Sequence, residues 1–164
     1  MSLGFVTEIN KDTAYDDPKD EFREGIELLK NEYPQKALVR LMRAFESDKH
    51  NAYYISFLGL AIGCAQRKWD KASELCEMAV QLKPKEIQFH LNLGEVYAAA
   101  GRREKALDKL DQALELFGED ARLMQARSKV QNRRAPLLPL IGREHFLNRG
   151  IGKLRHRILK SLGK

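Results

Sequence analysis

The chain has 164 residues, of which 43% are hydrophobic and 32% charged. This composition is typical of one folded domain or one short repeat array that is large enough to bury a core. No apolar run approaches the roughly 18 residues that a membrane-spanning helix needs, and the first residues lack the basic and apolar regions of a secretory signal. The two cysteines, Cys64 and Cys76, are too few for a disulfide scaffold, which favours a reducing, cytoplasmic compartment.

Charge is distributed unevenly along the chain. The net charge is −4 over residues 1–24, −1 over residues 25–121 and +11 over residues 122–164. A near-neutral body therefore carries an acidic start and a strongly basic end. Such an asymmetry indicates an interaction tail rather than a uniformly basic fold.

In chain order, we expect an acidic N-terminal extension at 1–17 and a helical body at 18–134. A Pro-containing linker at 135–142 follows, and then a basic amphipathic C-terminal helix at 143–164. Apolar residues at helical spacing predict seven helices in the body, at 19–32, 35–47, 52–66, 69–82, 87–100, 103–117 and 120–134. Asp120 is the expected N-cap of the seventh helix.

Small residues recur along this body with a period of 34 or 35. The glycines are Gly25, Gly59 and Gly94, and each precedes a pair of alanines seven apart: Ala37 and Ala44, Ala72 and Ala79, Ala106 and Ala113. Small residues at fixed points of two antiparallel helices let the backbones approach closely. The pattern therefore predicts three stacked helix pairs.

The sequence around these positions resembles the tetratricopeptide repeat (TPR), whose unit has 34 residues. The third unit matches best and reads His90-x2-Leu93-Gly94-x2-Tyr97, then Ala106-x3-Leu110 and Ala113. The second unit has one extra residue between its helices, and the first departs from the family leucine at Glu24. The resemblance covers about 18–120. It implies an all-α, right-handed solenoid of antiparallel helix pairs, with three repeats followed by a capping helix.

We find no pattern of catalytic or metal-binding residues, and we expect no cofactor, no metal site and no enzymatic activity. The four histidines have no partner at metal-ligand spacing. His90 stands in the family's tryptophan place, where a packed imidazole is expected. Cys64 and Cys76 are expected to be inert packing residues.

The resemblance implies a concave groove lined by the first helix of each unit. Some TPR proteins hold a partner's terminal carboxylate there with Lys and Asn, but only Asn92 among the corresponding residues is of a suitable type. The predicted groove is instead mainly apolar, and for Tyr53 and Phe57 a core position is an equal alternative. The candidate groove residues are Phe22, Ile26, Tyr53, Phe57, Leu60, Leu91, Asn92 and Glu95.

The C-terminal helix is the second candidate contact surface. Its apolar residues fall on one stripe, and its basic residues gather on the other side. Four surfaces remain open as the cover of this stripe: the chain's own repeats, a partner protein or second copy, an anionic membrane, and, least favoured, nucleic acid. The candidate contact residues are Leu147, Arg149, Ile151, Lys153, Leu154, Arg157, Ile158 and Lys160.

The resulting hypothesis is a non-catalytic adaptor or scaffold that binds a peptide or helix of a partner protein in its groove. Two alternatives remain. One is a small chaperone for an apolar client segment, and the other is an adaptor tethered to an anionic membrane or nucleic acid through its basic tail.

Overall fold

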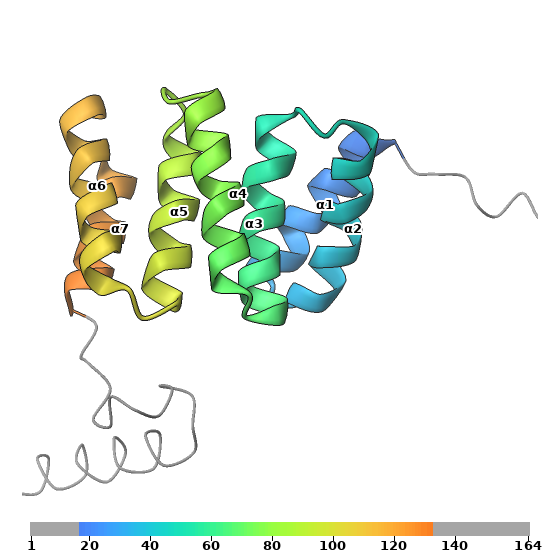
Figure 1. Cartoon of the computed structure of the whole chain (residues 1–164), viewed down its shortest axis with the longest axis horizontal. Helices are drawn as coiled ribbons and strands as arrows, with labels where there is room; N and C mark the ends of the chain where they lie inside the picture. Colours follow the sequence, from blue (N-terminus) through green and yellow to red (C-terminus); the bar gives the residue numbers. More distant parts are fainter. Residues whose placement is uncertain (1–16, 133–164) are drawn as a thin grey trace, which may run out of the picture. The chain divides into compact units, whose positions relative to one another are not determined.

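A computed structural model describes residues 17–132 of the chain (Figure 1). This range holds seven α-helices and no strand. The helices are α1 (Pro18–Lys30), α2 (Pro34–Ser47), α3 (Ala52–Gln66), α4 (Trp69–Leu82), α5 (Ile87–Ala99), α6 (Arg103–Phe117) and α7 (Ala121–Asn132). The predicted linker and C-terminal helix, and nearly all of the acidic extension, lie outside the described residues.

The predicted helices are confirmed, and their described ends agree with the structure to within two residues. The extra residue of the second unit does not lengthen the turn between its helices. It lies in α3, which has 15 residues where α1 and α5 have 13. The turn after α3 is correspondingly tight, and Arg67 closes it in the left-handed region at φ 57°.

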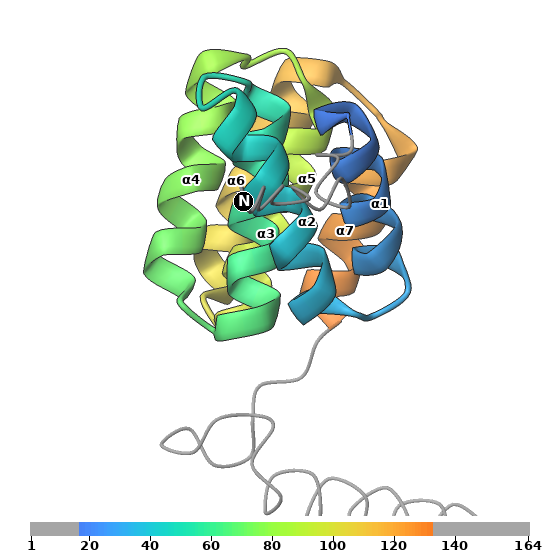
Figure 2. The same ribbon diagram turned by 90° about the vertical axis from the view of Figure 1, so that its right-hand side faces the viewer.

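The helices form antiparallel pairs α1–α2, α3–α4 and α5–α6, stacked side by side, with α7 after the last pair (Figure 1). We call the first member of each pair an A helix and the second a B helix. Seen from the end of the stack, α1 and α7 lie on one side and α4 lies on the opposite side (Figure 2). This is an all-α helical-repeat solenoid, as the sequence predicted.

Each A helix approaches its B helix closely at the repeated glycine. A Cβ atom added at Gly94 would lie 2.9 Å from Leu110 Cδ2, and one added at Gly25 would lie 2.6 Å from Leu41 Cγ. At Gly59 it would meet the backbone oxygen of Ala72 at 2.9 Å. The six alanines of the repeat are fully buried. The recurring small residues therefore set the distance between the helices of each pair.

Two clusters of apolar side chains form the core. The first joins α2, α3, α4 and the start of α5 and is covered by side chains of α1, and its largest fully buried members are Phe89, Leu41 and Ile55. The second joins α3, α4, α5, α6 and α7 around Leu93, Leu110 and Leu123. Each cluster contains side chains from neighbouring units. The apolar side chains of one unit are therefore buried only when the next unit packs against it.

The capping helix α7 is joined to the third unit by both apolar and polar contacts. Leu123 and Val130 are buried in the second cluster. Asp120 is the N-cap of α7, as predicted. Its carboxylate accepts hydrogen bonds from the backbone N–H groups of Arg122 (2.9 Å) and Leu123 (3.3 Å). Hydrogen bonds from the Arg122 side chain and these backbone groups hold the pKa of Asp120 below its usual value.

Gly59→Ala should destabilise the stack, whereas Gly94→Ala should be close to neutral. Alanine gains about 1 kcal/mol over glycine in helix propensity at both sites. At Gly94 the new methyl group meets only the Cγ and Cδ atoms of the flexible Leu110 side chain, but at Gly59 it meets a backbone carbonyl and the Cys76 sulfur. We expect Gly59→Ala to lower the free energy of unfolding by about 1–3 kcal/mol in urea titrations followed by circular dichroism. Equal values for the two variants would contradict this assignment of the helix contacts.

Candidate functional site: the A-helix face

The candidate groove residues lie on the A helices α1, α3 and α5. We call the surface that these residues form the A-helix face. Three of them carry aromatic rings. Phe22 of α1 is half-buried, with its ring centroid 5.3 Å from that of Phe57 and 5.0 Å from that of Tyr54 on α3. The structure therefore brings Phe22 and Phe57 together as one aromatic pair that joins the first two units.

Tyr53 is also half-buried, but it contacts α5 and the loop before it. Its ring centroid lies 5.0 Å from that of Phe89, and Lys83 Nζ lies 5.0 Å from the ring centroid. Its hydroxyl donates to Glu86 Oε2 at 2.5 Å, and this bond to an anion raises the pKa of Tyr53 above its ordinary value. Like Phe22 and Phe57, Tyr53 packs against the first core cluster while part of its surface stays exposed.

Two of the candidate residues belong to the packing between helices rather than to an open surface. Asn92 is 1% exposed; its amide donates to Ser56 Oγ at 2.9 Å and accepts from Gln88 Nε2 at 2.9 Å. Leu60 is 8% exposed and lies in the second core cluster. Asn92 was predicted to line the groove, but its amide is used in hydrogen bonds to Ser56 on α3 and to Gln88 within α5.

The remaining candidates differ in depth. Ile26 and Leu91 are half-buried, and Glu95 is exposed on α5. The partly exposed part of the A-helix face thus comprises Phe22, Ile26, Tyr53, Phe57, Leu91 and Glu95. The predicted tail residues, from Leu147 to Lys160, lie outside the described residues.

The side chains with chemical reactivity are held in unreactive settings. His90 is buried, with Nε2 2.8 Å from the Pro84 carbonyl oxygen and its ring 5.4 Å from that of Phe117, so the predicted packed imidazole is confirmed. Burial raises the pKa of the Cys76 thiol to about 12. Cys64 was expected to be packed but is exposed at the end of α3, and even so desolvation raises the pKa of its thiol to about 11. Both thiols are therefore protonated at neutral pH.

Tyr97 of the third unit carries a second tyrosine–glutamate contact. Its hydroxyl donates to Glu77 of α4. Burial, reinforced by this bond, raises the pKa of Tyr97 to about 12. The contact joins α5 to the B helix of the preceding unit, so it holds two successive units together.

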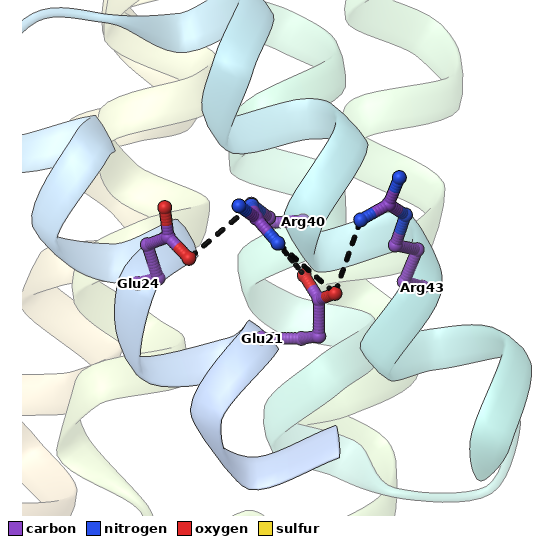
Figure 3. Close-up of polar contacts among 4 residues, drawn as sticks. All are labelled: Glu21, Glu24, Arg40 and Arg43. Carbon is purple, nitrogen blue, oxygen red and sulfur yellow. Dashed lines mark hydrogen bonds and ion pairs between the residues drawn. The ribbon is translucent and has the colours of Figure 1, made fainter. Parts of the chain in front are cut away.

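A network of four charged residues joins α1 to α2 (Figure 3). Glu21 is buried, and both of its carboxylate oxygens accept from Arg40 Nη1 at 3.1 Å. Arg43 Nη1 donates to the same carboxylate at 3.2 Å, and Arg40 Nε lies 3.2 Å from Glu24 Oε2. The side chain of Glu21 is only 4% exposed, whereas that of Glu24 is 49% exposed. Arg40 therefore links a buried and a solvated carboxylate.

Sequence reasoning did not predict this network. In the sequence, Glu24 stands out only as a departure from the family leucine. A signal was present, because Glu21 and Glu24 have the same spacing of three as Arg40 and Arg43 on the next helix. Two pairs of opposite charge at equal spacing on antiparallel neighbours match in register when the helices pack.

The described residues 17–132 hold neither a cluster of metal ligands nor a membrane-spanning helix. In that range no three potential metal ligands lie together. Among the described helices none has the length and apolar character required to cross a membrane.

The helix pairs of this structure can be compared with those of known repeat families. Residues 65–130 match a family model described as tetratricopeptide repeat. This segment is therefore a tetratricopeptide-repeat region. The match spans α4, α5, α6 and most of α7, which are the elements where the TPR spacing of small residues is most regular. A search of curated proteins finds no match to the sequence.

Solved TPR structures share the fold. The chain is similar to the TPR2B domain of yeast Sti1 in complex with an Hsp70 peptide (20% identity, TM-score 0.57), with 71% of this chain and 98% of that chain covered. It is also similar to the Sgt2 TPR domain of Aspergillus fumigatus, at 18% identity and TM-score 0.58 over 70% of this chain and 76% of that one. A Thermobaculum terrenum O-GlcNAc transferase mutant matches at 25% identity and TM-score 0.60, over 72% of this chain but only 22% of the transferase.

The buried carboxylate of the first TPR unit should contribute more to stability than the exposed one beside it. Glu21→Gln leaves two guanidinium groups without their shared anion, and we expect a loss of about 1–3 kcal/mol in the free energy of unfolding. Glu24→Gln removes a half-exposed pair and should cost less than about 1 kcal/mol. Urea titrations at low and high salt measure both, and salt should reduce the effect of Glu24→Gln more. A larger loss from Glu24→Gln than from Glu21→Gln would contradict this reading.

Proposed function

We propose that this protein is a non-catalytic adaptor or scaffold whose A-helix face binds an apolar peptide or helix of a partner protein. The observation that carries the proposal is the row of half-buried apolar side chains on successive A helices, which includes Phe22, Ile26, Phe57 and Leu91. Aromatic and aliphatic side chains that keep part of their surface exposed are the usual anchors of protein interfaces.

Similar structures support an interaction module in general terms. The yeast Sti1 domain is in complex with an Hsp70 peptide, and an RPAP3 domain of 18% identity is bound to the Hsp90 peptide SRMEEVD. Both likenesses are below 25% identity and concern the fold. The nature of the partner must therefore come from this chain's own residues.

Those residues favour an apolar partner segment over a terminal carboxylate. The positions that correspond to the family's carboxylate-binding residues hold Phe22, Ile26, Tyr53, Phe57 and Asn92. Four of these five offer no amide or cation, and the Asn92 amide is buried in bonds to Ser56 and Gln88. A carboxylate placed against these five side chains would lose hydration without gaining a charged partner from any of them, which is unfavourable.

The proposal of a non-catalytic protein rests on the chemistry of the available side chains. The two thiols are protonated at neutral pH, and the His90 ring is held against Pro84 and Phe117. Both cysteines are free thiols, which suits a reducing, cytoplasmic compartment, and we propose this as the location.

Substitution of Ile26 by lysine should weaken binding of apolar peptides selected from a displayed random library against the full chain. Ile26 is half-buried on α1 and belongs to neither core cluster, so Ile26→Lys places a charge among the proposed anchors. The matched control is Met42→Lys on α2, where an exposed apolar side chain of the B helix is changed in the same way. We expect at least about a tenfold loss for Ile26→Lys and little change for Met42→Lys. Equal losses would place the binding surface elsewhere.

A peptide that ends in an acidic carboxylate should bind poorly. The Hsp70 peptide SGPTIEEVD, bound by the second TPR domain of human RPAP3, is a suitable probe. We expect no saturable binding in isothermal titration with this chain, and the RPAP3 domain serves as the positive control. Tight binding that requires the free carboxylate would overturn the proposal of an apolar partner segment.

A further inference from the structure

The turns between the helices of each pair lie in one row along an edge of the stack. Figure 1 shows the turns α1–α2, α3–α4 and α5–α6 and the C-terminal end of α7 along its lower edge. We call this the turn edge, and we define it as each turn with three residues on either side, together with the last four described residues: 28–36, 64–71, 97–105 and 129–132. The loops between successive units and the start of α1 lie along the opposite edge, which we call the linker edge.

Contacts between neighbouring segments make the turn edge continuous. Gln35 Nε2, after the first turn, donates to the Ala65 carbonyl before the second turn at 2.6 Å. Arg102 of the third turn forms an ion pair with Asp70, just after the second turn. Arg103 donates to the backbone oxygen of Gln131 at 2.8 Å, which fixes the end of α7 beside the third turn. The row therefore runs without a break from the first unit to the end of α7.

The two edges differ in charge although the described residues 17–132 are neutral as a whole, with 19 basic and 19 acidic residues. The turn edge contains nine Lys or Arg residues and three acidic ones. The linker edge, taken in the same way as 17–20, 45–54, 80–89 and 115–123, contains five basic and eight acidic residues. The basic residues of the turn edge are Lys30, Lys36, Arg67, Lys68, Lys71, Arg102, Arg103, Lys105 and Lys129.

The basic C-terminal part of the sequence continues from this same edge. The last described residue is Asn132, and the next two in the sequence are Arg133 and Arg134. Residues 133–164 contain nine Lys or Arg residues and one Glu. The chain thus leaves the described structure at the edge where positive charge is concentrated.

We propose that the turn edge is a docking surface for an anionic lipid membrane, which it contacts side-on through its row of basic turns. A row of Lys and Arg side chains in and beside the turns suits a broad surface of negative charge, because each such residue near an anionic bilayer adds to the attraction. This surface is distinct from the A-helix face, so a bound membrane and a bound peptide do not compete for the same residues.

Two observations favour lipid over nucleic acid or an acidic protein. Residues 143–164 combine basic residues with an apolar stripe at helical spacing, and this combination is typical of segments that adsorb to a membrane interface. Stable attachment to a membrane generally requires two signals, and this chain carries both a basic surface and such a segment. Tyr33, 56% exposed at the first turn with Lys36 over its ring, is a residue type enriched at membrane interfaces.

Charge reversal on each edge of the full chain tests the proposal. The turn-edge variant is Lys68→Glu with Lys105→Glu, and the linker-edge control is Lys49→Glu with Lys85→Glu. All four lysines are exposed and lie at or close before a helix N-terminus or in its first turn, where glutamate is tolerated. Both variants carry the same net charge, and circular dichroism checks that both are folded.

Binding is measured by co-sedimentation with phosphatidylcholine vesicles that contain about one third phosphatidylglycerol, at roughly 0.1 M salt. We expect the unaltered chain and the linker-edge control to bind alike, and the turn-edge variant to bind at least about tenfold more weakly. Vesicles of phosphatidylcholine alone should retain none of the three.

Other outcomes would overturn the proposal. Equal loss in both variants would mean that only net charge matters, and no loss in either would mean that the turn edge takes no part. A chain that does not bind the anionic vesicles lacks the proposed surface. Tighter binding to duplex DNA than to the vesicles at the same salt, lost only in the turn-edge variant, would assign the edge to nucleic acid instead.

Discussion

The structure depends on the close approach of two helix backbones within each repeat. At Gly59 the gap between α3 and α4 is so small that a methyl group would meet the carbonyl of Ala72 at 2.9 Å. Because protein interiors are close-packed, this spacing determines which side chains reach the next unit. Phe89 packs with side chains of the preceding pair in the first core cluster, and Leu93 and Tyr97 pack in the second cluster with Ala72 and Cys76 of α4.

The first unit keeps this geometry with different chemistry. Where the second and third units place Ile55 and His90 in the packing, the first places Glu21, and Arg40 and Arg43 supply the compensating charge. A buried carboxylate is tolerated only when its oxygens are paired, and here both are. Ion pairs are directional where apolar contacts are not, so the first pair of helices is held in register by hydrogen-bond geometry as well as by shape.

Much of the fold was predictable because its determinants are local or periodic. Helix bounds follow from apolar spacing, and the Asp120 cap depends only on residues two and three positions away. The exposed fraction of each side chain on the A-helix face was less predictable. Periodicity indicates which side of a helix a residue lies on, but not which residue of another helix it contacts. Asn92 is buried because Ser56, 36 residues earlier, receives its hydrogen bond. The ring contact of Phe22 with Phe57 and the pairing of Glu21 with Arg40 likewise require the tertiary register of two helices.

The fluorescence of the single tryptophan reports on one position in this stack. Trp69 begins α4, and its ring lies against Gly63 of α3, where an added Cβ would come within 2.9 Å of Trp69 Cζ3. Its fluorescence therefore senses the junction inside the second unit, whereas far-ultraviolet ellipticity sums over every helix. Repeat arrays are coupled chiefly between neighbours, so their units can melt in sequence. A difference between the two signals during denaturation would reveal how far cooperativity extends along the array.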